Sequence, residues 1–203
     1  MIRPRAVVFD LGKVLLDFDY RIAARQLAPD CAVGPDRLLE LFNHDSLLLR
    51  YEEGAINTKE FFAEWSRLAG YRKSLDVFAP IFGSIFSPIE PMIQLQQTLS
   101  TRGFATYIFS NTNRLAIEQI QKKFNFYGRF TGYILSFEQK ALKPAPAIYE
   151  ALERLSGFRG SELFYMDDIA ENLAPAHARR WQTLLHETPE KTIAVLRERG
   201  LIK

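Results

Sequence analysis

The chain has 203 residues, 47% of them hydrophobic and 25% charged, and its formal net charge is +2. This composition is typical of a globular protein with a buried core, and the scattered basic residues form no nucleic-acid-binding footprint. The single cysteine, Cys31, excludes an intramolecular disulfide, and no Cys/His cluster has zinc-ligand spacing. No apolar run is long enough to span a bilayer or to act as a signal peptide, so we expect a cytoplasmic protein that binds no membrane.

The chain opens with a short apolar run that ends in an acidic residue. Ala6-Val7-Val8-Phe9 is rich in β-branched and aromatic side chains, which favours a strand buried on both faces of a parallel sheet. Asp10 ends the run, and Gly12 allows a tight change of direction. Parallel sheets bind ligands at the carboxyl ends of their strands, which makes Asp10 a candidate for chemistry. Taken alone, Asp10 is explained equally well as a cap of the next element.

A helical region follows, from Tyr20 to about Phe86. Its apolar residues recur at helical spacing, and no strand candidate interrupts them. A region of this length is too long for a loop in a compact domain. We therefore predict a helical cap subdomain at residues 18–87, inserted into an α/β core formed by residues 1–17 and 88–203.

Some conspicuous residues of the helical region are expected to be structural. The aromatic cluster Phe61-Phe62-Trp65 has helical spacing, which favours the core of the cap over a platform for a ligand. His44 and Asp45 lie between two predicted helices. We expect them to be structural rather than to face a ligand.

After Pro88, helices and strands alternate. The predicted strands are 104–109, 133–135, 163–166 and 181–185, and the predicted helices are 92–99, 115–124, 144–155, 173–179 and 189–199. This alternation predicts an α/β fold with a Rossmann-like, doubly wound parallel sheet.

The polar ends of the predicted strands converge on one edge of that sheet. They are Asp10, Ser110-Asn111 and Asp167-Asp168, and Lys143 precedes a helix at a Lys-Pro step. Carboxylates are the ligands that Mg²⁺ prefers, whereas a hydroxyl, backbone amides and a lysine suit a phosphate. The sequence therefore predicts a site for Mg²⁺ and a phosphate group.

Four motifs in register extend this interpretation to a family. They are Phe9-Asp10-Leu11-Gly12-Lys13-Val14, Ser110-Asn111-Thr112-Asn113, Leu142-Lys143-Pro144 with Ile148-Tyr149, and Tyr165-Met166-Asp167-Asp168 with Glu171-Asn172. In order and spacing they resemble the motifs of the haloacid dehalogenase superfamily, and the helical insertion resembles the cap of one subgroup. The first two motifs are most similar to the bacterial glucose-1-phosphate phosphatase type.

The resemblance implies a Mg²⁺-dependent phosphatase of small phosphorylated metabolites, sugar phosphates among them. Asp10 would attack phosphorus and form an aspartyl-phosphate, and it would also bind the metal. Asp168 would be the other carboxylate ligand, Gly12 would offer its backbone carbonyl, and Asp167 would hold a metal-bound water. Lys143 would bridge Asp10 and the phosphate, which Ser110 and Asn111 would also bind.

Gly12 departs from the pattern of most phosphatases in the superfamily. They carry an aspartate there as general acid and base, a role that is typically worth about 10² to 10⁴ in rate. A cap carboxylate, the substrate or an ordered water would have to replace it, although the glucose-1-phosphate phosphatase type shares the glycine. The alternatives are a catalytically weak binding or regulatory pseudoenzyme, favoured by Gly12, and a metal-independent dehalogenase, disfavoured by Asp167-Asp168. We expect a monomer or weak homodimer.

Three further departures lie beside these motifs. Ala145 stands where an acidic residue usually follows Lys-Pro, so one support of Lys143 is missing. Arg179-Arg180 replaces the usual Leu-Gly, so an easy left-handed helix cap is absent. Lys13 either adds positive potential at the mouth of the cleft or is simply solvated.

Overall fold

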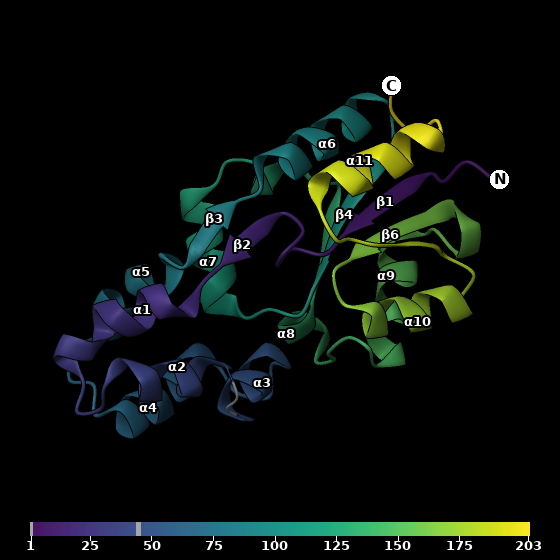
Figure 1. The fold of residues 1–203 in the computed structure, drawn as a ribbon. Coiled ribbons are helices and arrows are strands. Elements are labelled where there is room, and N and C mark those ends of the chain that lie inside the picture. The colour runs from purple at the N-terminus through teal and green to yellow at the C-terminus, as the bar shows by residue number, and fades with distance from the viewer. Residues whose placement is uncertain (1, 44–45) are drawn as a thin grey trace.

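A computed structural model describes residues 2–43 and 46–203 (Figure 1). His44 and Asp45, which the sequence analysis singled out, lie outside the described residues. The strands are β1 (Ala6–Phe9), β2 (Leu16–Phe18), β3 (Phe86–Pro88), β4 (Ala105–Ser110), β5 (Gly132–Leu135), β6 (Leu163–Asp167) and β7 (Gln182–Leu185). The helices are α1 (Tyr20–Leu27), α2 (Pro35–Asn43), α3 (Ser46–Glu52), α4 (Thr58–Ala69), α5 (Leu75–Gly83), α6 (Glu90–Thr101), α7 (Arg114–Lys123), α8 (Ser136–Gln139), α9 (Pro146–Ser156), α10 (Ala170–Ala178) and α11 (Pro189–Glu198).

The main sheet confirms the predicted α/β class. Its five strands run parallel in the order β5-β4-β1-β6-β7, so the first strand of the chain lies at the centre. Phe9 pairs with Ile108 of β4 and with Met166 of β6. The residues that follow these three positions therefore emerge side by side at the carboxyl edge of the sheet.

Helices cover both faces of this sheet (Figure 1). Val7 and Phe9 of β1 pack into a cluster with apolar residues of α6, α7 and α11, whereas Ala6 and Val8 pack on the opposite face with residues of α9 and α10. This alternation follows from the two-residue side-chain period of a strand. Because β1 is buried on both faces, it reads as a continuous apolar run in the sequence.

The helices α1 to α5 enclose a hydrophobic cluster of their own. Phe61 and Trp65 are fully buried in it, and the Trp65 ring lies 5.2 Å from that of Phe42 and 4.7 Å from that of Phe78. These aromatic residues are therefore core residues, as predicted. Strands β2 and β3 pair antiparallel on either side of the insertion, with Leu16 opposite Pro88. Each strand has three residues, and the sequence analysis missed this pair.

Two predicted helices begin elsewhere. The helix predicted from Pro144 begins at Pro146, because Pro146 occupies the first helical turn, where a missing N–H costs nothing. The helix predicted from Leu173 begins at Ala170, and the short helix α8 was not predicted. Among the residues described, no helix is both long enough and apolar enough to cross a membrane.

The C-terminal end of α10 adopts the left-handed turn without a glycine. Arg180 has φ = 63°, and the N–H of Trp181 donates to the carbonyl of Ala176 at 3.0 Å. The chain therefore keeps the turn and places a non-glycine residue in a disfavoured conformation.

Candidate active site

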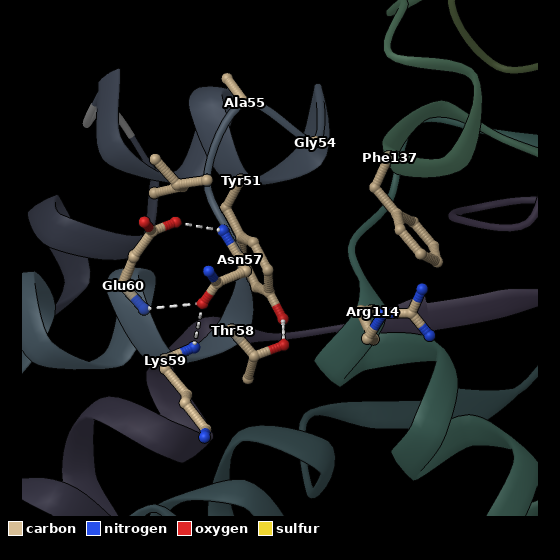
Figure 2. A pocket seen from close by; sticks show the side chains of 10 residues that line it. Tyr51, Gly54, Ala55, Asn57, Thr58, Lys59, Glu60, Arg114 and Phe137 are labelled. Carbon is tan, nitrogen blue, oxygen red and sulfur yellow. Dashed lines mark hydrogen bonds between the residues drawn. The ribbon is translucent and has the colours of Figure 1, made fainter.

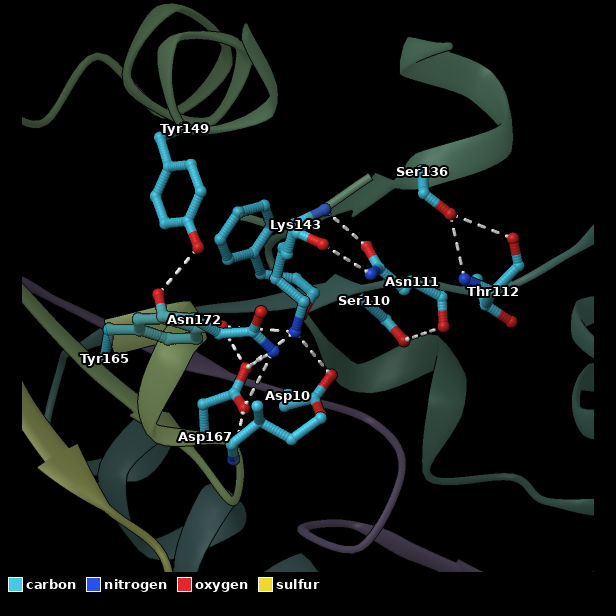
Figure 3. Close-up of polar contacts among 12 residues, drawn as sticks. Asp10, Ser110, Asn111, Thr112, Ser136, Lys143, Tyr149, Tyr165, Asp167 and Asn172 are labelled. Carbon is cyan, nitrogen blue, oxygen red and sulfur yellow. Dashed lines mark hydrogen bonds and ion pairs between the residues drawn. The ribbon is translucent and has the colours of Figure 1, made fainter. Parts of the chain in front are cut away.

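The carboxyl ends of β1, β4 and β6 bring the predicted polar residues together (Figure 3). Asp10 follows β1, Ser110 ends β4, and Asp167 ends β6. One carboxylate oxygen each from Asp10, Asp167 and Asp168 lies within 4.8 Å of the others. Asp10 and Asp167 are buried, and Asp168 is half-buried. Three carboxylates thus share a partly enclosed space at the edge of the sheet.

Lys143 lies at the centre of this cluster. Its side chain is 1% exposed, and its Nζ donates to Asp10 Oδ1 at 2.9 Å and to Asp167 Oδ2 at 2.7 Å. It also donates to the carbonyl of Phe109 at 3.1 Å and to the hydroxyl of Tyr165 at 3.1 Å. A lysine is rarely so deeply buried unless it is paired, and here two carboxylates and two neutral oxygens pair it.

Asp167 has partners for both of its carboxylate oxygens. Oδ2 accepts from Lys143 and from the hydroxyl of Tyr165, and Oδ1 accepts from the backbone N–H of Ile169 at 2.8 Å and from Asn172 Nδ2 at 3.1 Å. These donors fix the orientation of Asp167. Asp10 and Asp168 retain more free acceptor capacity toward the cleft.

The electrostatics of the cluster separate the three carboxylates. Burial raises the pKa of Asp10 to about 7, although Lys143 opposes the rise. Burial also raises the pKa of Asp168, and the negative charge of Asp167 adds to it. For Asp167, burial is outweighed by the ion pair with Lys143 and by its hydrogen bonds, which lower the pKa. Asp167 is therefore the carboxylate that Lys143 neutralises most completely.

This donor set fits a divalent cation. Three ionised carboxylates beside one lysine leave an excess of negative charge in a buried space, which is unfavourable without a compensating cation. Hard oxygen ligands of this kind suit Mg²⁺, which usually takes one or two carboxylates together with water and phosphate oxygens. Asp10 and Asp168 are the carboxylates with capacity for it.

Ser110 and Asn111 lie where the sequence placed them, but the Asn111 side chain has another task. Asn111 Nδ2 donates to the carbonyl of Lys143 at 2.9 Å, and Asn111 Oδ1 accepts from the Lys143 N–H at 2.7 Å. This pair of bonds holds the backbone of Lys143 without an acidic residue at Ala145. Ser110 is 2% exposed, and its hydroxyl makes one hydrogen bond of 3.2 Å to a neighbouring carbonyl.

A sequence model of the haloacid dehalogenase-like hydrolases matches residues 4–178. The chain belongs to the haloacid dehalogenase-like hydrolase family. It is 24% identical, over 82% of its length and 84% of the relative's, to a D-ribitol-5-phosphate phosphatase of Bacteroides thetaiotaomicron. The narrower resemblance to the glucose-1-phosphate phosphatase type stays a prediction.

Solved structures of similar proteins share the fold. A haloacid dehalogenase family enzyme of Bacteroides thetaiotaomicron, in complex with magnesium and inorganic phosphate, superimposes with a TM-score of 0.77 at 25% identity and covers 89% of this chain and 93% of that one. A family member from Porphyromonas gingivalis superimposes with a TM-score of 0.78 at 21% identity over 97% of this chain and 98% of that one.

Gly12 lies in this hydrolase beside a cavity of about 80 Å³ next to the carboxylate cluster. The cavity is lined by Leu11, Gly12, Leu16, Phe18, Tyr20, Glu52, Phe86, Ser110, Asn111, Thr112, Asn113, Ala116 and Ile120. Its walls therefore come from the ends of β1 and β4 and from the helical insertion. Burial raises the pKa of Glu52 to about 7, and the negative charge of Asp10 adds to the rise.

A larger cavity, of about 560 Å³, lies beside the loop between α3 and α4 (Figure 2). Its walls include Gly54, Asn57, Lys59, Arg114 and Phe137, and none of the clustered carboxylates lines it. Asn57 and Glu60 spend their side chains on capping α4. Size therefore does not locate the chemistry of this hydrolase; the buried carboxylates do.

Lys13 points away from the carboxylates. Its Nζ pairs with Asp17, donates to the carbonyl of Phe18 at 3.1 Å, and lies 4.6 Å from the centre of the Phe18 ring. Lys13 thus steadies the loop after β1.

The sequence analysis missed three polar residues of this site, namely Tyr165, Asn172 and Glu52. Tyr165 stands two residues before Asp167 on β6, so the strand period places both side chains on one face and could have paired them. Asn172 was noted in the fourth motif without a role. Glu52 carries no local signal, because tertiary packing of the insertion brings it to the cavity.

Proposed function

We propose that this hydrolase is a Mg²⁺-dependent phosphatase of small phosphorylated metabolites, and that Asp10 carries the phosphoryl group as an aspartyl-phosphate. The ion pair between Asp10 and the buried Lys143, within a cluster of three carboxylates, is the observation that supports this most directly. A buried nucleophile held beside a fixed cation suits phosphoryl transfer, which depends on positioning and charge stabilisation. A phosphatase among its relatives adds support.

In this proposal Asp10 and Asp168 hold Mg²⁺ with their carboxylates, and Gly12 contributes its backbone carbonyl. Asp167, with both oxygens hydrogen-bonded, holds the surrounding groups in place and orients a water of the metal shell. When bound, Mg²⁺ neutralises charge on the phosphate and on the three carboxylates. The magnesium and phosphate complex of the similar enzyme from Bacteroides thetaiotaomicron supports this assignment.

The chain's own residues would carry the reaction in two displacements. A carboxylate oxygen of Asp10 attacks phosphorus as the bond from phosphorus to the leaving oxygen breaks. Lys143 holds that carboxylate and binds a phosphate oxygen, while the Ser110 hydroxyl and backbone amides before α7 donate to the others. Water then attacks phosphorus, and the released phosphate leaves Asp10 as a free carboxylate.

Residues 18–87 act as a cap in this proposal. Phe18, Tyr20, Glu52 and Phe86, from the insertion, line the small cavity beside Asp10, so the insertion bounds the space for the leaving group. A small leaving group such as a sugar or polyol fits such a space. The polyol phosphate in the name of the Bacteroides relative points in the same direction.

A catalytically weak binding protein is the second candidate. The observation that favours it is Gly12, where most phosphatases of this family carry the acid and base. A metal-independent dehalogenase is disfavoured, because three clustered carboxylates need a compensating cation.

Phosphate release from a panel of monoesters, including D-ribitol 5-phosphate and glucose 1-phosphate, tests the proposal. We expect turnover that requires Mg²⁺ and falls by about 10⁴-fold or more in Asp10→Asn, because the nucleophile is removed. The exposed Asp36→Asn variant is the control. Folded protein that binds Mg²⁺ and releases no phosphate from any ester would favour the weak binding protein.

A further inference from the structure

The position two residues after Asp10 has no side chain, and a neighbouring ring fills the adjacent space. A Cβ on Gly12 would lie 3.0 Å from Phe18 Cε1, closer than ordinary van der Waals contact. The Phe18 ring is held by Lys13 at 4.6 Å and by the edge-to-face ring of Tyr20 at 5.7 Å. A carboxylate that serves this space must therefore come from another element.

Glu52, at the C-terminal end of α3, supplies a carboxylate to the same cavity. It lines the cavity together with Gly12, Ser110 and Asn111, and it is the only carboxylate among the described residues that do so. The side chain is half-buried and makes no hydrogen bond or ion pair with any described residue. A partly desolvated carboxylate without a protein partner has capacity for a hydroxyl, a water or a proton from a ligand.

Tertiary contacts hold Glu52 at this position. The Ser136 hydroxyl donates to the Glu52 carbonyl at 2.6 Å, and the Tyr51 hydroxyl accepts from the Leu115 N–H at 2.9 Å. Gly54 packs so closely that a Cβ there would lie 2.2 Å from the Phe137 carbonyl oxygen. Figure 2 shows Tyr51 and Gly54 facing the segment that carries Phe137. The end of α3 is therefore docked on the core by its backbone, which leaves the Glu52 carboxylate free.

We propose that Glu52 is the general acid and base of the phosphatase reaction, replacing the side chain that is absent at Gly12. This inference rests on the proposed function. As Asp10 attacks phosphorus, the departing oxygen takes the proton of the Glu52 carboxyl group. As water attacks phosphorus in the second displacement, its proton passes to the Glu52 carboxylate, the bond from phosphorus to Asp10 breaks, and the starting protonation state is restored. Burial raises the pKa of Glu52 to about 7, which suits both roles.

The leaving group distinguishes this role from a structural one. An alkoxide leaving group needs a proton, whereas acetate leaves without one. We therefore compare Glu52→Gln with wild type on D-ribitol 5-phosphate, or the best alkyl ester of the panel, and on acetyl phosphate. We expect kcat/KM to fall about 10²- to 10⁴-fold on the alkyl ester and less than about 10-fold on acetyl phosphate. We also expect the aspartyl-phosphate to accumulate, because the base for water is lost.

Glu53→Gln is the matched control, since Glu53 is the exposed neighbour of Glu52, and it should leave both substrates near wild type. Glu52→Asp retains a carboxyl group and should show an intermediate loss, again confined to the alkyl ester; it decides the question should Glu52→Gln not fold. Equal losses on both substrates, or no loss on either, would overturn the role of Glu52. The phosphatase proposal fails separately, through turnover that survives in Asp10→Asn.

Discussion

The two sides of the strand-end site differ in how their polar groups are paired. On the lysine side, defined by Asp10, Lys143, Tyr165, Asp167 and Asn172, Lys143 has four partners and Asp167 accepts from four donors. On the glycine side, defined by Gly12, Phe18 and Glu52, a backbone without a side chain, a ring and an unpaired carboxylate face a small cavity. The first side is complete within the protein, and the second is completed by a ligand.

This difference teaches how the work of the site is divided. Fixed charges and donors that need no rearrangement stabilise a transition state most effectively, and the lysine side has this character. A group that exchanges protons with a substrate needs free capacity, and the glycine side has it. The predictions below break or sharpen this contrast, from the largest expected effect to the smallest.

Lys143→Met breaks the lysine side. It leaves two buried carboxylates without their cation, so we expect the free energy of unfolding to fall by about 3 to 5 kcal/mol. Loss of a fixed positive charge beside the phosphate should lower kcat about 10²- to 10³-fold. Denaturant unfolding and phosphate release measure the two effects. Lys140→Met, at an exposed lysine, is the control, and equal effects in both variants would refute the assigned role of Lys143.

Asp168→Asn tests the metal site without reference to activity. At a Mg²⁺ concentration about 100 times the dissociation constant, wild type should gain about 2.7 kcal/mol of stability. The variant should lose most of this gain, because it removes one of the two free carboxylate ligands. Thermal unfolding with and without Mg²⁺ measures it. A gain of wild-type size in Asp168→Asn would place the metal elsewhere.

Tyr165→Phe weakens the lysine side without removing a charge. Its hydroxyl donates to Asp167 and accepts from Lys143, so its loss should cost about 1 to 2 kcal/mol in unfolding free energy. We expect activity to fall by about 10-fold or less, since Asp10 still contacts Lys143. Tyr107→Phe on β4, whose hydroxyl bonds to no described residue, is the matched control. A neutral result for Tyr165→Phe would show that the hydroxyl does not order the cluster.

Arg180→Gly lies outside both sides and should act in the opposite direction. Arg180 is exposed and has φ = 63°, so glycine should relieve backbone strain and stabilise the protein by about 0.5 to 1 kcal/mol. Chemical denaturation measures the gain, and phosphate release should not change. A loss of stability would mean that the arginine side chain contributes more than its backbone strain costs.

Much of the fold and part of the site could be predicted from the sequence. The buried strand at Ala6–Phe9 has an apolar run that no helix surface would show, and parallel pairing makes its polar end, Asp10, meet those of β4 and β6. The strands β2 and β3 escaped prediction, because three residues are too few to show a period.

The roles of single side chains were harder to predict, because they depend on distant partners. An asparagine after β4 suits a phosphate as well as a backbone, and only the fold brings Asn111 to Lys143, 32 residues away. Glu52 reaches the cavity through the docking of α3 onto Ser136 and Phe137, which no local pattern encodes. Tyr165 was within reach, since it shares a strand face with Asp167.

The central claim is that Asp10 accepts the phosphoryl group in this site. Acid quenching of the Mg²⁺-loaded enzyme during turnover of a ³²P-labelled monoester tests it most directly. The account predicts label on the protein that hydroxylamine releases, as expected for an acyl phosphate, and none in Asp10→Asn. Undiminished phosphate release by Asp10→Asn, with no label on either protein, would contradict it.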